Sequence, residues 1–88
     1  MDKEIFIFAE SAGRHGFTVE DVVYAFEHHT NMMQHTEETG ALKIAFVGPC
    51  LQPLVDYIEV IMIVVPDSKI VVIHVQSLTD NFRHLLER

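Results

Sequence analysis

Apolar residues occur in short runs along this 88-residue chain, and most runs end at glycine, proline or a polar cluster. The clearest runs, residues 57–65 and 70–76, are rich in Val and Ile and are typical of strands. Pro66-Asp67-Ser68 separates the two runs, which predicts a β-hairpin. Another strand is predicted over residues 41–47, with its end at Gly48-Pro49.

The segment that starts at Thr18 has the pattern of an amphipathic helix. Thr18 can cap the helix, and Asp21, three residues later, completes a capping box. Apolar residues at three- and four-residue spacing form the predicted buried stripe: Val19, Val22, Val23 and Phe26. Two shorter helices are predicted over residues 9–15, with an end at Gly16, and over residues 80–88.

The remaining segments carry weaker patterns. Residues 4–8 fit either a strand or the start of a helix, and residues 31–36 fit an edge strand. A turn is predicted at residues 37–40 and a loop at residues 50–56. The order predicts one α+β domain over residues 1–88: N-terminal helices, a three- to four-stranded antiparallel meander and a short C-terminal helix.

Neither face of the predicted hairpin is polar. In residues 57–65, Ile58, Val60 and Met62 point one way, whereas Ile61 and Ile63 point the other. A sheet with one face in water has polar residues at every second position, so both faces here need a cover. Three short helices can cover one face, and the other is expected to bind a second copy or another protein. The alternative is a monomer whose helices cover both faces.

Composition narrows the possible partners. Six Lys and Arg stand against thirteen Asp and Glu, which gives a formal net charge of -7. Nucleic-acid binding relies on cations that replace the phosphate counterions, so the charge disfavours RNA without excluding it. The single cysteine, Cys50, favours a cytoplasmic protein without disulfides. The apolar runs are too short to span a membrane.

The histidines do not form a recognisable metal site. His28 and His29 are adjacent and cannot point to one ion from a helix, and His35 has no ligand partner at a typical zinc spacing. A solvated helix end is the preferred interpretation of His28 and His29. We therefore expect neither a metal nor another cofactor.

Four segments, in order, resemble the BrnT-like toxins, small relatives of the RelE-type ribonucleases of bacterial toxin–antitoxin modules. The first segment, Arg14-His15-Gly16-Phe17-Thr18-Val19-Glu20-Asp21, resembles the junction between two helices in that family. The other three resemble its strands and its closing helix; they are residues 44–49, residues 58–65, and residues 72–79 followed by Phe82-Arg83. The resemblance covers nearly the whole chain, although each motif is mostly apolar patterning with a glycine.

The resemblance implies an α+β endoribonuclease that works without a metal and is neutralised by an antitoxin protein. It places candidate catalytic groups at His74, as general acid or base, and at Arg83, as the phosphate ligand. Glu59 and Lys43 on the neighbouring strands are candidates for the same site, although they also fit an ordinary cross-strand pair. The chain departs from the family in its acidic charge and in the polar residues after His74, where relatives carry Arg or Lys. A catalytically degenerate protein-binding or homodimeric module is therefore the alternative.

Overall fold

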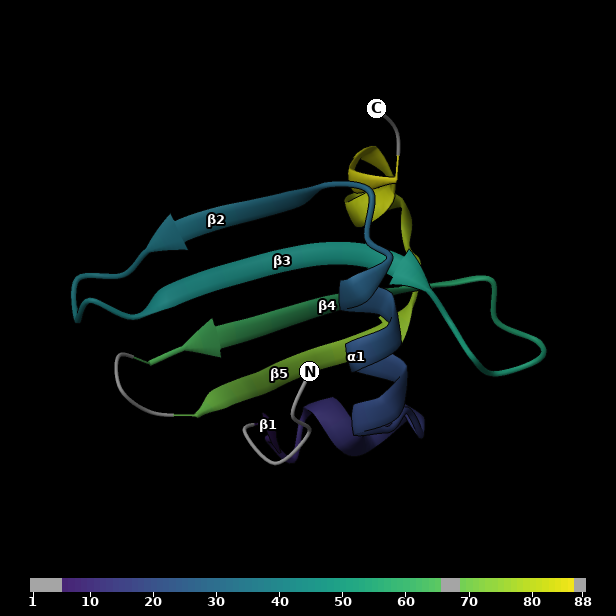
Figure 1. Cartoon of the computed structure of the whole chain (residues 1–88), viewed down its shortest axis with the longest axis horizontal. Helices are drawn as coiled ribbons and strands as arrows, with labels where there is room; N and C mark the ends of the chain where they lie inside the picture. Colours follow the sequence, from purple (N-terminus) through teal and green to yellow (C-terminus); the bar gives the residue numbers. More distant parts are fainter. Residues whose placement is uncertain (1–5, 66–68, 87–88) are drawn as a thin grey trace.

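A five-stranded mixed sheet forms the centre of the protein (Figure 1). The computed structural model describes residues 6–65 and 69–86. The elements are, in chain order, β1 (Phe6–Phe8), η2 (Ala12–His15), α1 (Val19–Glu27), β2 (Met32–Thr36), β3 (Leu42–Pro49), β4 (Tyr57–Val64), β5 (Ile70–Ser77) and η3 (Asp80–Leu85), where η denotes a 3₁₀-helix. Parts of three predicted segments lie outside the described residues: the first two residues of 4–8, the turn expected at residues 66–68 and the last two residues of the expected C-terminal helix.

The α+β class is confirmed, but the prediction of a three- to four-stranded, purely antiparallel sheet is wrong. The strand order is β1-β5-β4-β3-β2, as Figure 1 shows from bottom to top. Strands β2 to β5 form the antiparallel part, and β2 is its edge, as expected for residues 31–36. β1 adds a fifth strand parallel to β5, with Phe6 opposite Ile70 and Phe8 opposite Val72. The described chain therefore starts with a strand instead of a helix.

Local capping explains where α1 begins. The Thr18 hydroxyl accepts a hydrogen bond from the Asp21 backbone N–H at 3.2 Å, and the Asp21 carboxylate accepts one from the Thr18 N–H at 3.0 Å. This reciprocal capping box is the one that the sequence predicts. The other two predicted helices are single 3₁₀ segments, and η2 covers only the second half of residues 9–15. Gly16 ends η2 in the left-handed conformation, with φ of 81°.

The core lies between α1 and one face of the sheet. Side chains from α1, β3, β4 and β5 are fully buried there, among them Val22, Phe46, Val60 and Val75. The backbone of α1 comes so close to β3 that a Cβ on Gly48 would lie 2.2 Å from the Ala25 carbonyl oxygen. The strand therefore continues through Gly48-Pro49 instead of ending before it, because glycine is the residue that leaves room for the helix.

A β-bulge in β5 changes which of its side chains share a face. Ile61 pairs with His74 and Met62 pairs with Val72, so Ile73 is the extra residue. Val72 and Val75 consequently share the core face, and both are fully buried. An uninterrupted alternation along residues 70–76, which a regular strand predicts, would place Val72 and Val75 on opposite faces, and the bulge overturns it.

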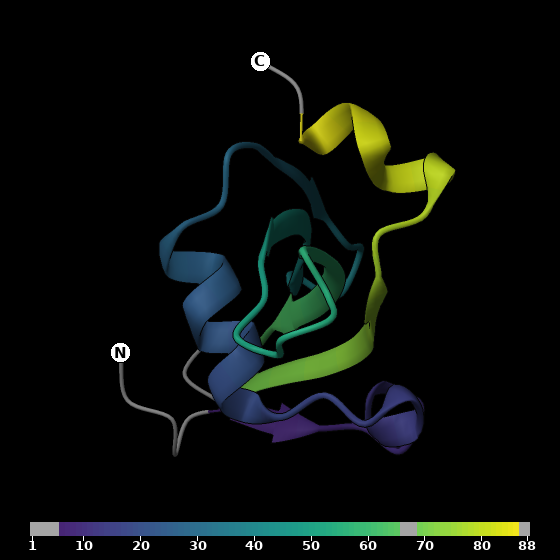
Figure 2. The same cartoon turned by 90° about the vertical axis from the view of Figure 1, so that its right-hand side faces the viewer.

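The second face of the sheet, which we call the open face, carries Ile7, Met33, Lys43, Ala45, Ile61, Ile63 and Val71. Figure 2 shows α1 on one side of the sheet and η3 on the other. In the described residues, η3 contacts β3 and lies over the end of this face near Glu59, while the far end has no helix packed on it. The described helices therefore cover the core face except at its β2 edge, where Gln34 and Thr36 are exposed, and they cover the open face only in part.

Candidate functional site

A buried carboxylate lies at the end of the open face. Glu59 on β4 is 1% exposed, and its two oxygens accept four hydrogen bonds. His74 Nε2 and Gln76 Nε2 lie 2.8 and 3.1 Å from Oε2. The backbone N–H and the hydroxyl of Thr79 donate to Oε1 at 2.7 and 2.5 Å. We call these four residues the Glu59 cluster.

Hydrogen bonding decides the ionisation of Glu59. Burial, the largest single effect, raises the pKa of the Glu59 carboxyl, but the hydrogen bonds from Thr79, His74 and Gln76 together outweigh it. The pKa therefore lies below its ordinary value of 4.5. Glu59 is a carboxylate at neutral pH, and as such it can only accept hydrogen bonds.

This acceptor fixes the arrangement of protons on His74. Because the Glu59 carboxylate has no proton to donate, His74 Nε2 carries the hydrogen that joins them. In the neutral ring, Nδ1 is then the proton acceptor. Phe82 of η3 stacks on the imidazole, with ring centroids 6.0 Å apart and an angle of 23° between the planes. The side chain is 30% exposed, so water and small groups can reach it.

The Glu59 cluster also attaches η3 to the sheet. Thr79 immediately precedes η3, and the two hydrogen bonds that it donates to Glu59 end on β4, the middle strand of the sheet. Leu85, 4% exposed, and the hydrogen bond from the Asn31 side chain to the Leu85 carbonyl hold the far end of η3. The Glu59 cluster therefore has two roles. It attaches η3 to the sheet, and it orients the His74 imidazole through the Glu59 carboxylate.

Arg83 lies on the same 3₁₀-helix but not in the cluster. Its Nε donates to Asp80 Oδ1 at 3.3 Å, and its side chain is 56% exposed. With Tyr57 and Ser77 among its neighbours, Arg83 lines a hollow of about 260 Å³ at the start of β4 and the end of β5. Ser77 and Leu78, which also line the hollow, lie between Gln76 and Thr79 in the chain, so the hollow borders the cluster.

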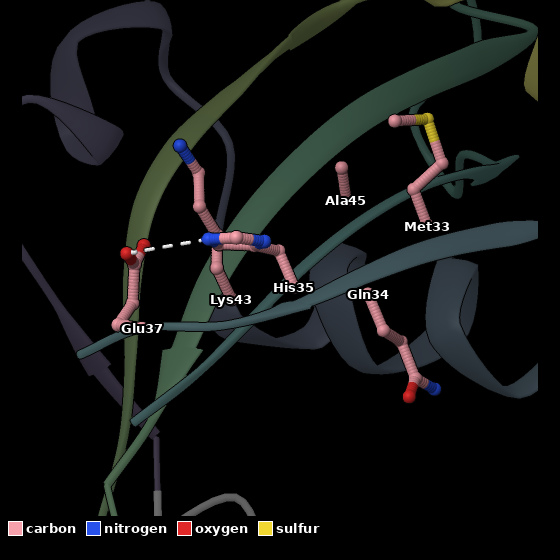
Figure 3. Close-up of a pocket in the computed structure, with 6 residues that line it drawn as sticks. All are labelled: Met33, Gln34, His35, Glu37, Lys43 and Ala45. Atoms are coloured by element: carbon pink, nitrogen blue, oxygen red, sulfur yellow. Dashed lines mark ion pairs between the residues drawn. The ribbon is translucent and has the colours of Figure 1, made fainter. Parts of the chain in front are cut away.

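Lys43 lies apart from the other three predicted site residues. It pairs with Ile63, whereas Glu59 pairs with Val47, four residues further along β3. At about 3.4 Å per residue this separation is ~14 Å along the strand. Lys43 instead lines a separate hollow on the open face with Met33, His35 and others (Figure 3). The structure therefore brings Glu59 and His74 together, places Arg83 nearby and places Lys43 elsewhere.

Two of the groups that bind Glu59, Gln76 and Thr79, were not among the predicted site residues. Phe82, which stacks on His74, was not among them either. Gln76 lies two residues after His74, a spacing that places both side chains on one face of a strand. The cross-strand pairs Glu59–Gln76 and Ile61–His74 bring these residues together, and that register depends on the bulge at Ile73.

A second polar cluster connects α1 to the loop after β3. Asp21, 3% exposed, accepts a hydrogen bond from the Gln52 side chain at 2.9 Å, and the Cys50 thiol lies 3.9 Å from its other oxygen. Burial raises the pKa of the Cys50 thiol, Asp21 raises it further, and hydrogen bonds from Gln52 and Leu51 backbone groups lower it in part. The described residues contain no group of three or more His, Cys, Asp or Glu side chains arranged to hold a metal ion.

No family model matches this chain, and no curated protein sequence or solved structure is significantly similar to it. The resemblance to the BrnT-like toxins therefore stays a prediction. Among residues 6–65 and 69–86, no helix combines the length and the apolar content needed to cross a membrane.

Proposed function

We propose that this protein is the toxin component of a bacterial toxin–antitoxin module and cleaves RNA without a metal, with His74 as its acid–base group. The observation that carries the proposal is the 2.8 Å hydrogen bond between His74 Nε2 and the buried Glu59 carboxylate. An imidazole oriented in this way presents Nδ1 as a proton acceptor, which is the role of a general base. A cytoplasmic location and neutralisation by an antitoxin protein are part of the same proposal.

The proposed chemistry requires few groups. His74 Nδ1 takes the proton from a ribose 2′-hydroxyl, the 2′-oxygen attacks the adjacent phosphorus, and the bond from phosphorus to the 5′-oxygen breaks. Protonated His74 then returns the proton to the leaving 5′-oxygen. Arg83, which borders the Glu59 cluster, is the proposed ligand of the phosphate charge, and Glu59 stabilises the imidazolium. Lys43 is too distant to contact the same phosphate.

Matched variants test this proposal. His74→Ala should reduce cleavage of a labelled single-stranded RNA at least about 100-fold, the low end for loss of an acid–base group. Arg83→Ala should also reduce it about 100-fold or more, as expected for loss of a group that stabilises the developing charge. His15→Ala and Arg14→Ala remove the same residue types from η2, at exposed positions, and should cleave at the rate of the original protein. Equal cleavage by His74→Ala and His15→Ala, in the presence of a chelator, would remove the catalytic assignment. The melting temperature of each variant is the control for folding.

A binding module without catalysis is the second candidate. It is favoured by the net charge of -7 and by the exposed pair of Arg83 with Asp80, which competes with a phosphate for the same guanidinium. This candidate predicts no RNA cleavage by the purified protein and no growth arrest when the protein is expressed alone. Growth arrest that His74→Ala abolishes favours the ribonuclease instead.

A further inference from the structure

The hollow of about 260 Å³ beside the Glu59 cluster has walls that the proposed mechanism does not use. It lies at one end of the sheet, where the loop of residues 50–56 projects beside the start of β4 and the end of β5 (Figure 1). Arg83 of η3 lines the same hollow and is the only one of its residues with a role in that mechanism. Pockets for drug-sized ligands start at roughly 300 Å³, so this hollow suits a single ring system.

An aromatic ring and two leucines line the hollow. Tyr57 is 37% exposed and Leu54 is 98% exposed, and Leu78 is partly exposed beside them. The Leu78 N–H donates to the Tyr57 carbonyl oxygen at 3.1 Å, which holds two of these walls together. Exposed aromatic and apolar groups of this kind bind the bases of single-stranded RNA by stacking.

Three polar side chains in the hollow are available to a ligand. The Asp56 carboxylate and the hydroxyls of Tyr57 and Ser77 make no hydrogen bond or ion pair with any of residues 6–65 and 69–86. The backbone at Asp56 is held in place, because its carbonyl oxygen accepts a hydrogen bond from the Cys50 N–H at 3.1 Å. A carboxylate only accepts hydrogen bonds, so Asp56 favours a base that presents N–H donors.

The hollow is also close to the proposed acid–base group. Tyr57 and Glu59 are two residues apart on β4, so their side chains leave the same face of the strand about 7 Å apart. Glu59 holds His74, and Arg83 lines the hollow itself. A nucleotide whose base stacks on Tyr57 therefore has its ribose and phosphate within reach of the groups proposed to act on them.

We infer that this hollow binds the base of the nucleotide next to the scissile phosphate and that it prefers guanine. The inference rests on the proposed ribonuclease function, because it assigns the hollow a part of that substrate. The Watson–Crick edge of guanine presents two adjacent N–H groups, which one carboxylate can accept together. The N–H group of adenine or cytosine is next to a nitrogen acceptor, and that of uracil lies between two carbonyl oxygens, so these acceptors repel a carboxylate. Asp56 therefore selects guanine, and Tyr57 stacks on it.

Two nucleotides with the same phosphate test the base site without any cleavage. Guanosine 3′-monophosphate should bind the protein at least about fivefold more tightly than uridine 3′-monophosphate in an NMR titration, as expected for one additional hydrogen bond. Because both probes carry the same phosphate, the contribution of Arg83 cancels in this comparison. The guanosine nucleotide should shift the ring signals of Tyr57 and the amide signals of Asp56 and Ser77.

Matched variants separate the two proposed roles. Asp56→Asn should reduce the preference for the guanosine nucleotide to less than twofold, whereas Glu38→Gln, which removes a charge from an exposed turn, should leave it unchanged. Tyr57→Leu should weaken both nucleotides at least about fivefold, the low end for loss of base stacking. Tyr24→Leu makes the same exchange on α1 and should change neither Kd more than twofold. The NMR spectrum of each variant is the control for folding.

Cleavage of a long RNA supplies an independent test. When the cut sites are mapped by primer extension, guanine should occupy the same side of most cuts made by the original protein. Asp56→Asn should distribute the cuts over all four bases, and Glu38→Gln should keep the original pattern.

Several results would overturn the inference. Equal Kd values for the two nucleotides, a guanine preference that persists in Asp56→Asn, or shifts confined to residues outside the hollow would each do so. Binding of the nucleotides as expected with no cleavage of RNA would refute the proposed ribonuclease and leave the base site in place. Cleavage without base preference, at equal rates in Tyr57→Leu and Tyr24→Leu, would refute the base site alone.

Discussion

Thr79→Val removes one hydrogen bond from the Glu59 cluster and changes little else. Val has nearly the shape of Thr, so the variant exchanges the hydroxyl, 2.5 Å from Glu59 Oε1, for a methyl group. The Thr79 backbone N–H keeps its bond to the same oxygen. His74 and Gln76 keep their bonds to the other oxygen, so the buried carboxylate retains three of its four donors.

The expected loss of stability is large for so small a change. A hydrogen bond to a charged group contributes about 1.5–3 kcal/mol, and Glu59 is too deeply buried for water to replace the missing donor. We take ~2 kcal/mol as the expected decrease in the free energy of unfolding. For a domain of this size that corresponds to a fall in the melting temperature of about 8–16 °C.

Urea unfolding followed by circular dichroism measures the effect at pH 7. With a slope of about 1 kcal/mol per molar urea, the unfolding midpoint should fall by about 2 M. The amide protons of η3 should also exchange faster, because Thr79 attaches this 3₁₀-helix to β4. The control Thr30→Val makes the same exchange at an exposed position, and its stability should change by less than about 0.5 kcal/mol.

The refuting result is equally specific. If Thr79→Val and Thr30→Val differ by less than about 0.5 kcal/mol, the Thr79 hydroxyl does not stabilise the buried carboxylate. If stability falls but the amide protons of η3 exchange at an unchanged rate, the Thr79 hydroxyl stabilises the protein without attaching η3 to β4.

Three further predictions concern the fold and its titratable groups. Gly48→Ala should lower the free energy of unfolding by about 3 kcal/mol in urea, because the added Cβ would overlap the Ala25 backbone. The control Gly13→Ala, whose Cβ would have no atom within 4 Å, should lower it by less than about 0.5 kcal/mol. Because the folded pKa of Glu59 lies below its ordinary value of 4.5, Glu59 adds stability that is fully present above that pH and is lost as the pH falls through the folded pKa. Between pH 5 and 3, the free energy of unfolding should therefore fall less steeply in Glu59→Gln than in the original protein; parallel curves would contradict this. The Cys50 thiol, whose pKa is raised, should react with iodoacetamide at pH 8 more slowly in the native protein than in urea, and equal rates would count against its burial.

Local patterns in the sequence were enough to predict α1 and the β4–β5 hairpin. Thr18 and Asp21 are three residues apart, so the capping box forms within one turn and does not depend on distant parts of the chain. The β4–β5 hairpin follows from two runs of β-branched residues separated by a proline-containing turn sequence. Interactions of this kind depend on neighbours a few residues away, so the local order and spacing of residues predict them.

Tertiary contacts decided the position of β1 and the composition of the site. The strand Phe6–Phe8 pairs with β5 across more than sixty residues, and three apolar residues have no periodicity that distinguishes a strand from a helix. The cluster needed the bulge at Ile73, which sets the faces of β5 and brings His74 to Glu59. A bulge has no reliable pattern in one sequence, so the register could not be predicted.

The sequence alone therefore determined that the chain contains more apolar strand surface than its own helices cover. Only the tertiary structure decided which surface that is, because α1 packs on the face of Phe46 and Val60, whereas η3 covers only the part of the other face near Glu59 and Met33. The physical reason is that apolar content is a property of the chain, whereas coverage depends on how elements distant in sequence are placed in space.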